Sequence, residues 1–325
     1  MTEALLDVRD LHVWFDLPHG AELHAVQGVS FSLEPGDRLG LVGESGCGKT
    51  TTILAVMGLL PPSASVAGQV ILNGQDIMLG AEQTVRPHRW KDIAMVFQGA
   101  MNALNPVKTV GSQIVEPMVL HEVAEGAAAK TRAGELLELV GIPAASAARF
   151  PHEFSGGMRQ RAAIAMALAC EPKLLLADEP TTALDVMVQA QILDLLIRLT
   201  DDLGLTMLLV THDLPVVAQV CERAAVMYAG RIAETGPMDT LFHDPRHPYT
   251  RLLFAATPDL YGEGDVVSIP GSPPRLDHRI EGCAFRDRCD KAFERCVAET
   301  PALLEVAGGH RAACHLNDLN GEGAA

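Results

Sequence analysis

At 325 residues, 48% of them hydrophobic, the chain is longer than a typical single domain and can bury a large core, so we expect one main domain with an appendage. The formal net charge of −16 excludes non-specific attraction to nucleic acid or to an anionic membrane, since both need an excess of lysine and arginine. No apolar run is long enough for a membrane span, and the start, MTEALLDVRD, has no basic segment followed by a hydrophobic one. We therefore expect a cytoplasmic chain whose seven cysteines stay reduced.

Apolar runs that lack alternation and end in polar or Gly-rich turns predict buried, parallel strands with helices between them. The expected strands cover residues 38–42, 173–177 and 205–211, and the expected helices cover residues 50–60, 160–170 and 188–203. This alternation predicts an α/β sheet that binds ligands at the carboxyl ends of its strands. Proline becomes frequent at residues 243–274, and four of the seven cysteines follow, so we expect a domain boundary near residue 240.

The first expected strand leads into the phosphate-binding motif G-x-x-x-x-G-K-[ST], which a helix follows. Its glycines let backbone N–H groups converge on phosphate oxygens, Lys49 adds a positive charge, and Thr50 can bind Mg²⁺ through its hydroxyl. Cys47 is either an inert small residue or, at a helix N-terminus, a thiol of lowered pKa that alkylating agents attack. The expected nucleotide-binding residues of the loop are Gly43, Glu44, Ser45, Gly46, Cys47, Gly48, Lys49, Thr50 and Thr51.

The second of these strands ends in two acidic residues, Asp178 and Glu179, which point to opposite sides because strand residues alternate. Asp178 is suited to bind Mg²⁺, and Glu179 is suited to take a proton from, or polarise, the water that attacks the γ phosphate. His212, after the next strand, is suited to contact that phosphate or that water. Without the phosphate loop, the acids would be helix caps or solvated loop residues and the histidine a structural residue.

With these motifs in place, residues 5–240 resemble the ATP-binding-cassette family. Gln98, in Val-Phe-Gln, is similar to the family's glutamine that senses Mg²⁺ and the transporter, and Asp185 is similar to the D-loop aspartate. Phe15 resembles the aromatic residue on which adenine stacks, with the adjacent Trp14 as the alternative. The residues that match the family signature are Ser155, Gly156, Gly157 and Gln160.

The resemblance implies an α/β fold, with a P-loop NTPase (RecA-like) core, a β-subdomain and an inserted helical subdomain at about residues 102–170. It implies a nucleotide-binding domain at residues 1–240 and a small Cys-rich extension at residues 241–325. Two such domains close head to tail in this family, so that the signature of one binds the ATP of the other; Ser155 can also be read simply as a helix N-cap. The implied catalytic residues are Glu179, His212 and Gln98, and the residues implied around Mg²⁺ are Thr50, Gln98 and Asp178.

The extension resembles that of the oligopeptide and dipeptide importer subfamily through the sequences HPYT and IPGSPP. Four thiolates in a reduced compartment can hold either Zn²⁺ or a [4Fe–4S] cluster. The resemblance favours the cluster over unligated cysteines, with zinc third, and gives it a structural role. His310 and His315 are expected to be surface residues, not ligands. The candidate ligands are Cys283, Cys289, Cys296 and Cys314.

The resemblance implies ATP hydrolysis that powers the import of peptides or related small solutes, at the cytoplasmic face of the inner membrane. The implied partners are a second ATPase subunit, commonly a different one, two transmembrane permease subunits and, indirectly, an extracytoplasmic solute-binding protein. Nucleic acid is not an expected partner. The alternatives are a soluble cassette ATPase of DNA repair or translation, and an ATPase regulated by the redox state of its cysteines.

Overall fold

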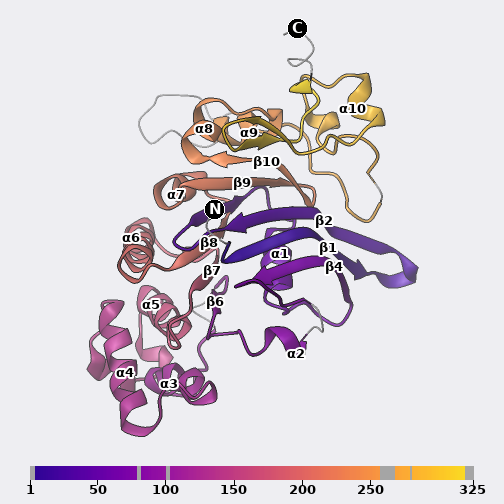
Figure 1. Ribbon diagram of the computed structural model, residues 1–325. Coiled ribbons are helices and arrows are strands. Elements are labelled where there is room, and N and C mark those ends of the chain that lie inside the picture. The colour runs from indigo at the N-terminus through magenta and orange to yellow at the C-terminus, as the bar shows by residue number, and fades with distance from the viewer. Residues whose placement is uncertain (1–3, 79–81, 100–102, 257–267, 279, 319–325) are drawn as a thin grey trace. The chain divides into compact units, whose positions relative to one another are not determined.

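The computed structural model describes residues 4–78, 82–99, 103–256, 268–278 and 280–318 (Figure 1). The chain forms two compact units. By their place in the sequence alone, we call them the central unit, which comprises mainly residues 34–37 and 80–210, and the flanking unit, which comprises residues 3–33, 38–79 and 211–325. Residue 102, where the helical subdomain is expected to begin, lies outside the described residues. Within the described ranges, no helix combines the length and the apolar character that a membrane crossing needs.

A parallel sheet forms the core of the central unit. Its strands, in their order across the sheet, are β6 (Ile93–Val96), β7 (Leu174–Asp178) and β8 (Thr206–Thr211). Every residue of these strands is buried, which explains why the sequence shows continuous apolar runs there and no alternation. The strands expected at residues 173–177 and 205–211 are confirmed, with ends that differ by no more than one residue.

The helices of the central unit are α2 (Glu82–Val85), α3 (Val110–Leu120), α4 (Gly126–Leu139), α5 (Gly156–Ala167) and α6 (Val186–Leu203), with short 3-10 turns η3 (Ala144–Ala148) and η4 (Pro151–Glu153). Side-chain caps mark where α3, α5 and α6 begin. Ser155 caps α5 by accepting a hydrogen bond from the Met158 N–H at 3.3 Å, and Asp185 caps α6 in the same way. At its other end α6 stops at Gly204, whose φ of 62° is the left-handed conformation that closes a helix.

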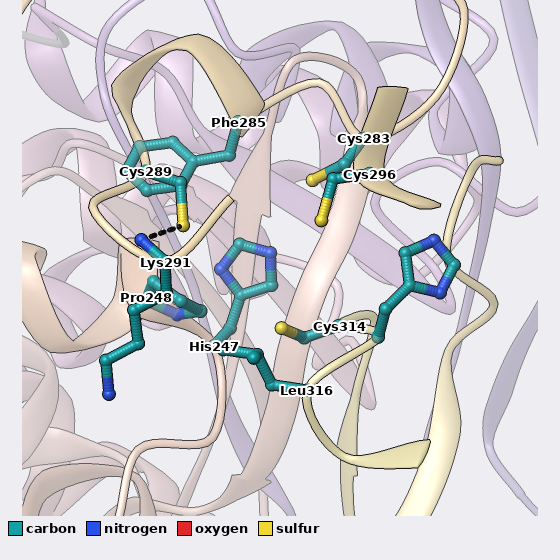
Figure 2. A pocket seen from close by; sticks show the side chains of 10 residues that line it. His247, Pro248, Cys283, Phe285, Cys289, Lys291, Cys296, Cys314 and Leu316 are labelled. Carbon is teal, nitrogen blue, oxygen red and sulfur yellow. Dashed lines mark hydrogen bonds between the residues drawn. The ribbon is translucent and has the colours of Figure 1, made fainter. Parts of the chain in front are cut away.

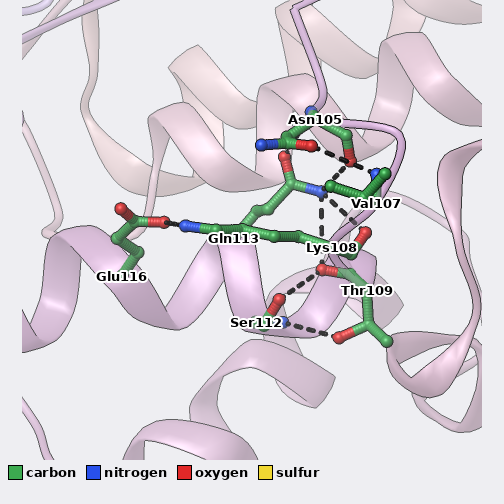
Figure 3. A network of polar contacts seen from close by, with 7 residues as sticks. All are labelled: Asn105, Val107, Lys108, Thr109, Ser112, Gln113 and Glu116. Carbon is green, nitrogen blue, oxygen red and sulfur yellow. Dashed lines mark hydrogen bonds and ion pairs between the residues drawn. The ribbon is translucent and has the colours of Figure 1, made fainter.

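One glutamine holds the segment that leads into α3 (Figure 3). The amide nitrogen of Gln113 donates to the backbone oxygens of Asn105 and Lys108, both at 3.1 Å. Its amide oxygen accepts from the Asn105 N–H at 2.7 Å. Because a buried amide must be paired, Gln113 fixes the path of this segment into the helices expected as the helical subdomain.

The flanking unit contains two sheets. The first is antiparallel, with strands β2 (Glu22–Leu33), β1 (Leu6–Asp16), β4 (Ala64–Leu72) and β5 (Gln75–Asp76) in that order. The second has strands β11 (Leu304–Ala307), β12 (His310–Ala312), β10 (Arg231–Pro237), β9 (Arg223–Tyr228) and β3 (Arg38–Val42) in that order. Only the β3–β9 pair among these five strands is parallel. The strand expected at residues 38–42 is confirmed.

The helices of the flanking unit are short. They are α1 (Lys49–Val56), α7 (Leu214–Val220), α8 (Met238–His243), α9 (Pro248–Ala255) and α10 (Glu294–Ala298), with 3-10 turns η1 (Pro18–Gly20) and η5 (Arg286–Arg288). The helix expected at residues 50–60 ends early, at Val56. The reason is that Gly58 takes a left-handed φ of 59° and turns the chain away.

A buried carboxylate joins the C-terminal extension to the second sheet. Glu234, on β10, is fully buried. Its oxygens accept hydrogen bonds from the N–H of Arg246 at 2.6 Å, the N–H of His247 at 2.9 Å and Nε2 of His310 at 2.6 Å. His310 and His315 are both buried, so the expectation that they are surface residues is wrong. For His310 the reason is that β12 pairs with β10 and brings this side chain to Glu234.

Candidate functional site

The phosphate loop between β3 and α1 needs glycine at two positions. Gly43 has a φ of 150° and Gly48 a φ of 105°, a region that residues with side chains rarely adopt. A Cβ atom on Gly43 would lie 2.1 Å from the Met227 carbonyl oxygen, and one on Gly48 would lie 2.6 Å from that of Ala25. The loop can therefore take the tight path that brings consecutive N–H groups together for a phosphate.

Lys49 begins α1 and folds back onto this loop. Its Nζ atom donates to the backbone oxygens of Gly43 at 2.7 Å and Glu44 at 3.0 Å. The residue is only 6% exposed. The positive charge thus lies against the loop, at a helix N-terminus that also favours an anion.

Cys47 is buried inside the loop and lies 3.7 Å, by its sulfur, from the Lys49 ammonium nitrogen. Burial raises the pKa of the Cys47 thiol, although the nearby Lys49 acts in the opposite direction. A protonated, enclosed thiol is a poor nucleophile. The structure therefore favours the inert reading of Cys47 over the reactive one.

Two side chains that the sequence did not predict to lie at this loop hold Glu44 in place. Arg288 donates to both carboxylate oxygens of Glu44, at 2.7 and 3.0 Å. The hydroxyl of Tyr249 accepts a hydrogen bond from the Glu44 N–H at 2.9 Å. Tyr249 lies 205 positions and Arg288 lies 244 positions beyond Glu44, so no local pattern could reveal either contact.

The turn after β7 carries the two acidic residues. Asp178 is 2% exposed. Glu179 has a φ of 44°, and its N–H donates to the Val210 oxygen at 2.8 Å. A left-handed conformation costs a residue with a side chain about 1–3 kcal/mol, and such strain is concentrated at functional sites.

Gln98 and Glu179, two of the predicted catalytic residues, contact each other. Nε2 of Gln98 donates to Oε2 of Glu179 at 2.7 Å, and the Thr182 hydroxyl donates to the same oxygen at 2.9 Å. The contact follows from the sheet register, because β6 and β7 are parallel and both end just before these residues. His212 follows β8 as an exposed residue.

The predicted signature begins at the N-cap of α5, so the simple reading of Ser155 as an N-cap is confirmed. A Cβ atom on Gly157 would lie 2.6 Å from Cγ1 of Val188, so glycine here allows α5 to approach the start of α6. Gln160 is 3% exposed, and its amide nitrogen has no hydrogen-bond partner within the described ranges. The cap explains Ser155 structurally, whereas nothing in the described residues accounts for the buried Gln160 amide.

The two candidate aromatic residues lie next to each other on β1. The Trp14 ring stacks on His24, with ring centroids 4.6 Å apart, and on His12, with centroids 5.3 Å apart. Phe15 makes no ring contact of this kind among the residues described. Since adenine needs an available ring to stack on, the stacking of Trp14 with two histidines favours Phe15 as the adenine contact.

The four cysteines of the extension line one small cavity, together with His247 and His315 (Figure 2). They come from the segments on both sides of η5, from α10 and from the segment after β12. Burial raises the pKa of Cys283 and Cys289, and it raises that of Cys314 to about 11. The described residues contain no group of three or more His, Cys, Asp or Glu side chains arranged to hold a metal ion.

Two family models match the chain. The model described as "ABC transporter" matches residues 26–182, which include the phosphate loop and Glu179. The model described as "Oligopeptide/dipeptide transporter, C-terminal region" matches residues 233–296, which include Tyr249 and Arg288.

Similar chains extend over nearly the whole sequence. The oligopeptide transport ATP-binding protein OppD of Bacillus subtilis (strain 168) is 48% identical over 312 residues, or 94% of this chain and 87% of that protein. The dipeptide transport ATP-binding protein DppD of Escherichia coli (strain K12) is 44% identical over 316 residues, 96% of each chain. A solved dimeric ATP-binding cassette, in a post-hydrolysis state with ADP and phosphate, has 27% identity and a TM-score of 0.63 over 72% of this chain and 98% of that one. The α/β cassette fold expected from the sequence is thereby confirmed.

Proposed function

This chain belongs to the ABC transporter family, in its oligopeptide and dipeptide branch, and we propose that it binds and hydrolyses ATP to power a peptide importer. The observation that carries the proposal is the presence, in one chain, of a cassette with its phosphate loop and of an importer-type C-terminal region. A soluble ATPase of DNA repair or translation is not favoured, because the relatives reported above are named as transport ATP-binding proteins and the match covers almost their full length.

In this proposal the phosphate loop binds the β and γ phosphates of ATP. The backbone N–H groups between Gly43 and Thr51 surround the phosphate oxygens, and Lys49 exchanges its bonds to the loop carbonyls for bonds to phosphate. Hydroxyl, amide and carboxylate oxygens fit the preference of Mg²⁺, so Thr50, Gln98 and Asp178 are the residues proposed to hold it. When bound, Mg²⁺ neutralises the charge that develops on the phosphates.

Glu179 is the proposed general base. Its carboxylate would accept a proton from, or polarise, the attacking water, while Gln98 and Thr182 hold one of its oxygens in a fixed direction. His212 is proposed to contact the γ phosphate or the same water. Phe15 is the proposed stacking partner of adenine, since the Trp14 ring is occupied by two histidines.

We propose that a second cassette subunit completes the ATP site. Ser155, Gly156, Gly157 and Gln160 would face the γ phosphate on the partner, with Asp185 nearby at the start of α6. The solved cassette with 27% identity is a dimer, which supports closure on ATP between two subunits. The proposed importer further contains a second ATPase subunit that differs from this chain, two permease subunits and, indirectly, an extracytoplasmic solute-binding protein. This chain would lie at the cytoplasmic face of the inner membrane.

The cysteine-lined cavity is proposed to hold a [4Fe–4S] cluster, with Zn²⁺ or free thiols as the alternatives. The support is the kind and place of the donors: Cys283, Cys289, Cys296 and Cys314 all line one cavity, and four thiolates are the usual ligands of such a cluster. In the described residues these side chains are not arranged as a metal-binding group. The thiols must lose their protons to bind metal, and the bonds formed would stabilise an extension with little apolar core of its own. We also propose that the nucleotide-binding domain ends near residue 240 and that the extension begins there.

The experiment that tests the function is ATP binding and turnover by the wild type and by Lys49→Ala. We expect the variant to lose most of its ATP affinity, because the phosphates lose their main counter-charge. Unchanged affinity would contradict the assignment of the phosphate loop.

Anaerobic purification from a membrane extract tests the partners and the cluster. Two multi-span proteins that co-purify with this chain, in a brown sample containing iron and sulfide, would support both proposals. A colourless sample that contains zinc, or no metal, would remove the iron–sulfur assignment, and the absence of membrane subunits would count against the importer.

A further inference from the structure

The C-terminal extension holds the second residue of the phosphate loop by both its backbone and its side chain. Arg288 donates two hydrogen bonds to the Glu44 carboxylate, and the Tyr249 hydroxyl accepts one from the Glu44 N–H. The Arg288 side chain is 4% exposed and that of Glu44 is 25% exposed, so solvent screens this ion pair only weakly. Two-point pairing of a guanidinium with a carboxylate also fixes direction, which a single contact does not.

Arg288 is itself held on every side. Its Nε donates to the Pro270 oxygen at 2.7 Å, and its Nη1 also donates to the Tyr228 hydroxyl at 3.2 Å. The guanidinium carbon lies 5.7 Å from the ring centres of both Tyr228 and Phe285. An arginine with this many fixed contacts is a rigid support for Glu44.

A buried aromatic cluster stiffens the same contact. The rings of Tyr228 and Tyr249 have centroids 4.5 Å apart, and Phe285 lies 5.2 and 5.4 Å from them. All three side chains are at most 4% exposed. Phe285 also lines the cysteine cavity (Figure 2), and η5, which ends with Arg288, is bracketed by Cys283 and Cys289.

We propose that Arg288 and Tyr249 are positioning residues for the phosphate loop, through which the extension sets the affinity of the chain for ATP. Arg288 neutralises Glu44, so that the loop does not present an uncompensated negative charge to the incoming phosphates. Tyr249 keeps the Glu44 peptide in place, and with it the start of the row of N–H groups. The proposal rests on the ATP site proposed above.

The test is the dissociation constant of ATP, measured by titration of the full-length chain. Arg288→Ala should weaken binding about tenfold, because it leaves Glu44 unpaired beside the phosphates. Adding Glu44→Gln to this variant should restore affinity to within about threefold of the wild type, since the unpaired charge is then removed. Tyr249→Phe keeps the ring and should give a smaller loss of affinity, of about threefold.

Arg251→Ala is the matched control, because Arg251 makes an exposed ion pair with Asp290 in the same extension. It should leave ATP affinity unchanged. Unaltered affinity in a folded Arg288→Ala protein would overturn the proposal, and so would a double variant that binds as weakly as Arg288→Ala alone. If Arg288→Ala does not fold, Arg288→Lys replaces it, with a partial loss of affinity expected and no loss overturning the proposal. Loss of binding in Lys49→Ala tests the ATP site separately, so the two failures can be distinguished.

Discussion

Glu179 shows how much a single residue of this chain is constrained. Its backbone is left-handed, and one of its carboxylate oxygens accepts hydrogen bonds from both Gln98 and Thr182. The buried strand β7, which ends at Asp178, holds the next residue in this strained conformation. The left-handed backbone in turn sets the direction of the Glu179 side chain. As the proposed base, a carboxylate held this firmly would not need to reorganise when the water attacks the γ phosphate.

Glu179→Gln should keep ATP binding but slow hydrolysis about a hundredfold or more, which is the usual effect of losing a general base. The amide retains the size and one oxygen of the carboxylate but does not accept the proton. Turnover at saturating ATP and equilibrium ATP binding are the two measurements. Glu138→Gln, an exposed change on α4, is the control, and wild-type turnover in Glu179→Gln would remove this residue from its role.

Cys47 should resist alkylation, although it lies in the phosphate loop. It is 5% exposed and burial raises the pKa of its thiol, so both access and the thiolate fraction are low at neutral pH. Iodoacetamide at pH 7.5 should modify Cys47 at least about tenfold more slowly than a free cysteine peptide. Peptide mass spectrometry gives the rate, with Cys47→Ser identifying the modified site, and rapid labelling would restore the reactive reading.

Among the helices and strands, those that are continuous apolar runs in the sequence could be predicted, but the residue at which an element ends could not always be. The strands β7 and β8 were predictable because fully buried parallel strands are continuous apolar runs. Helix α1 ends early because of Gly58, whose left-handed turn is one of two behaviours open to a glycine in a helical pattern. Family motifs implied a separate role for Gln98 and for Glu179, whereas the contact between them depends on the register of β6 and β7 and was not predicted.

Helix α9 depends on a buried histidine for its first turn, so its stability should depend on pH. Nδ1 of His247 accepts from the Tyr249 N–H at 3.0 Å, and burial lowers the pKa of His247 to about 4. The unfolded chain binds a proton here below about pH 6.5, but the folded chain binds it only near pH 4. The free energy of unfolding should therefore fall as the pH drops through this window.

His247→Asn isolates this effect, because asparagine is a good N-cap that does not titrate. Between pH 7 and pH 5 the wild type should lose about 2 kcal/mol more unfolding free energy than the variant, as a difference of roughly 1.5 pH units from the unfolded pKa implies. Urea unfolding at both pH values measures this. His24, whose pKa burial and His12 also lower to about 4, is present in both proteins and cancels. Equal losses in the two proteins would mean that His247 is not the titrating group.

At the scale of the whole molecule, the contacts that join the extension to the cassette could not be read from the sequence. Arg288 meets Glu44 across 244 positions, and His310 meets Glu234 across 76. Each depends on how several strands and turns pack, and neither partner stands in a motif that names the other. The expectation that His310 is a surface residue failed for this reason: its burial depends on the pairing of β12 with β10, and no local pattern predicts that pairing.

Glu234 should therefore contribute more to the stability of the extension than any exposed acid. Glu234→Ala leaves the N–H groups of Arg246 and His247 and the ring nitrogen of His310 without their acceptor, at a cost of about 3–5 kcal/mol. Glu305→Ala, on β11, removes an exposed acid of the same extension and should change stability by less than about 0.5 kcal/mol. Chemical unfolding gives both values, and hydrogen exchange should show faster opening of β12 in Glu234→Ala alone. Equal unfolding free energies for the two variants would contradict this prediction. They would mean that the aromatic cluster and Arg288 hold the extension without Glu234, and the ATP affinity of Glu234→Ala would then stay at the wild-type value.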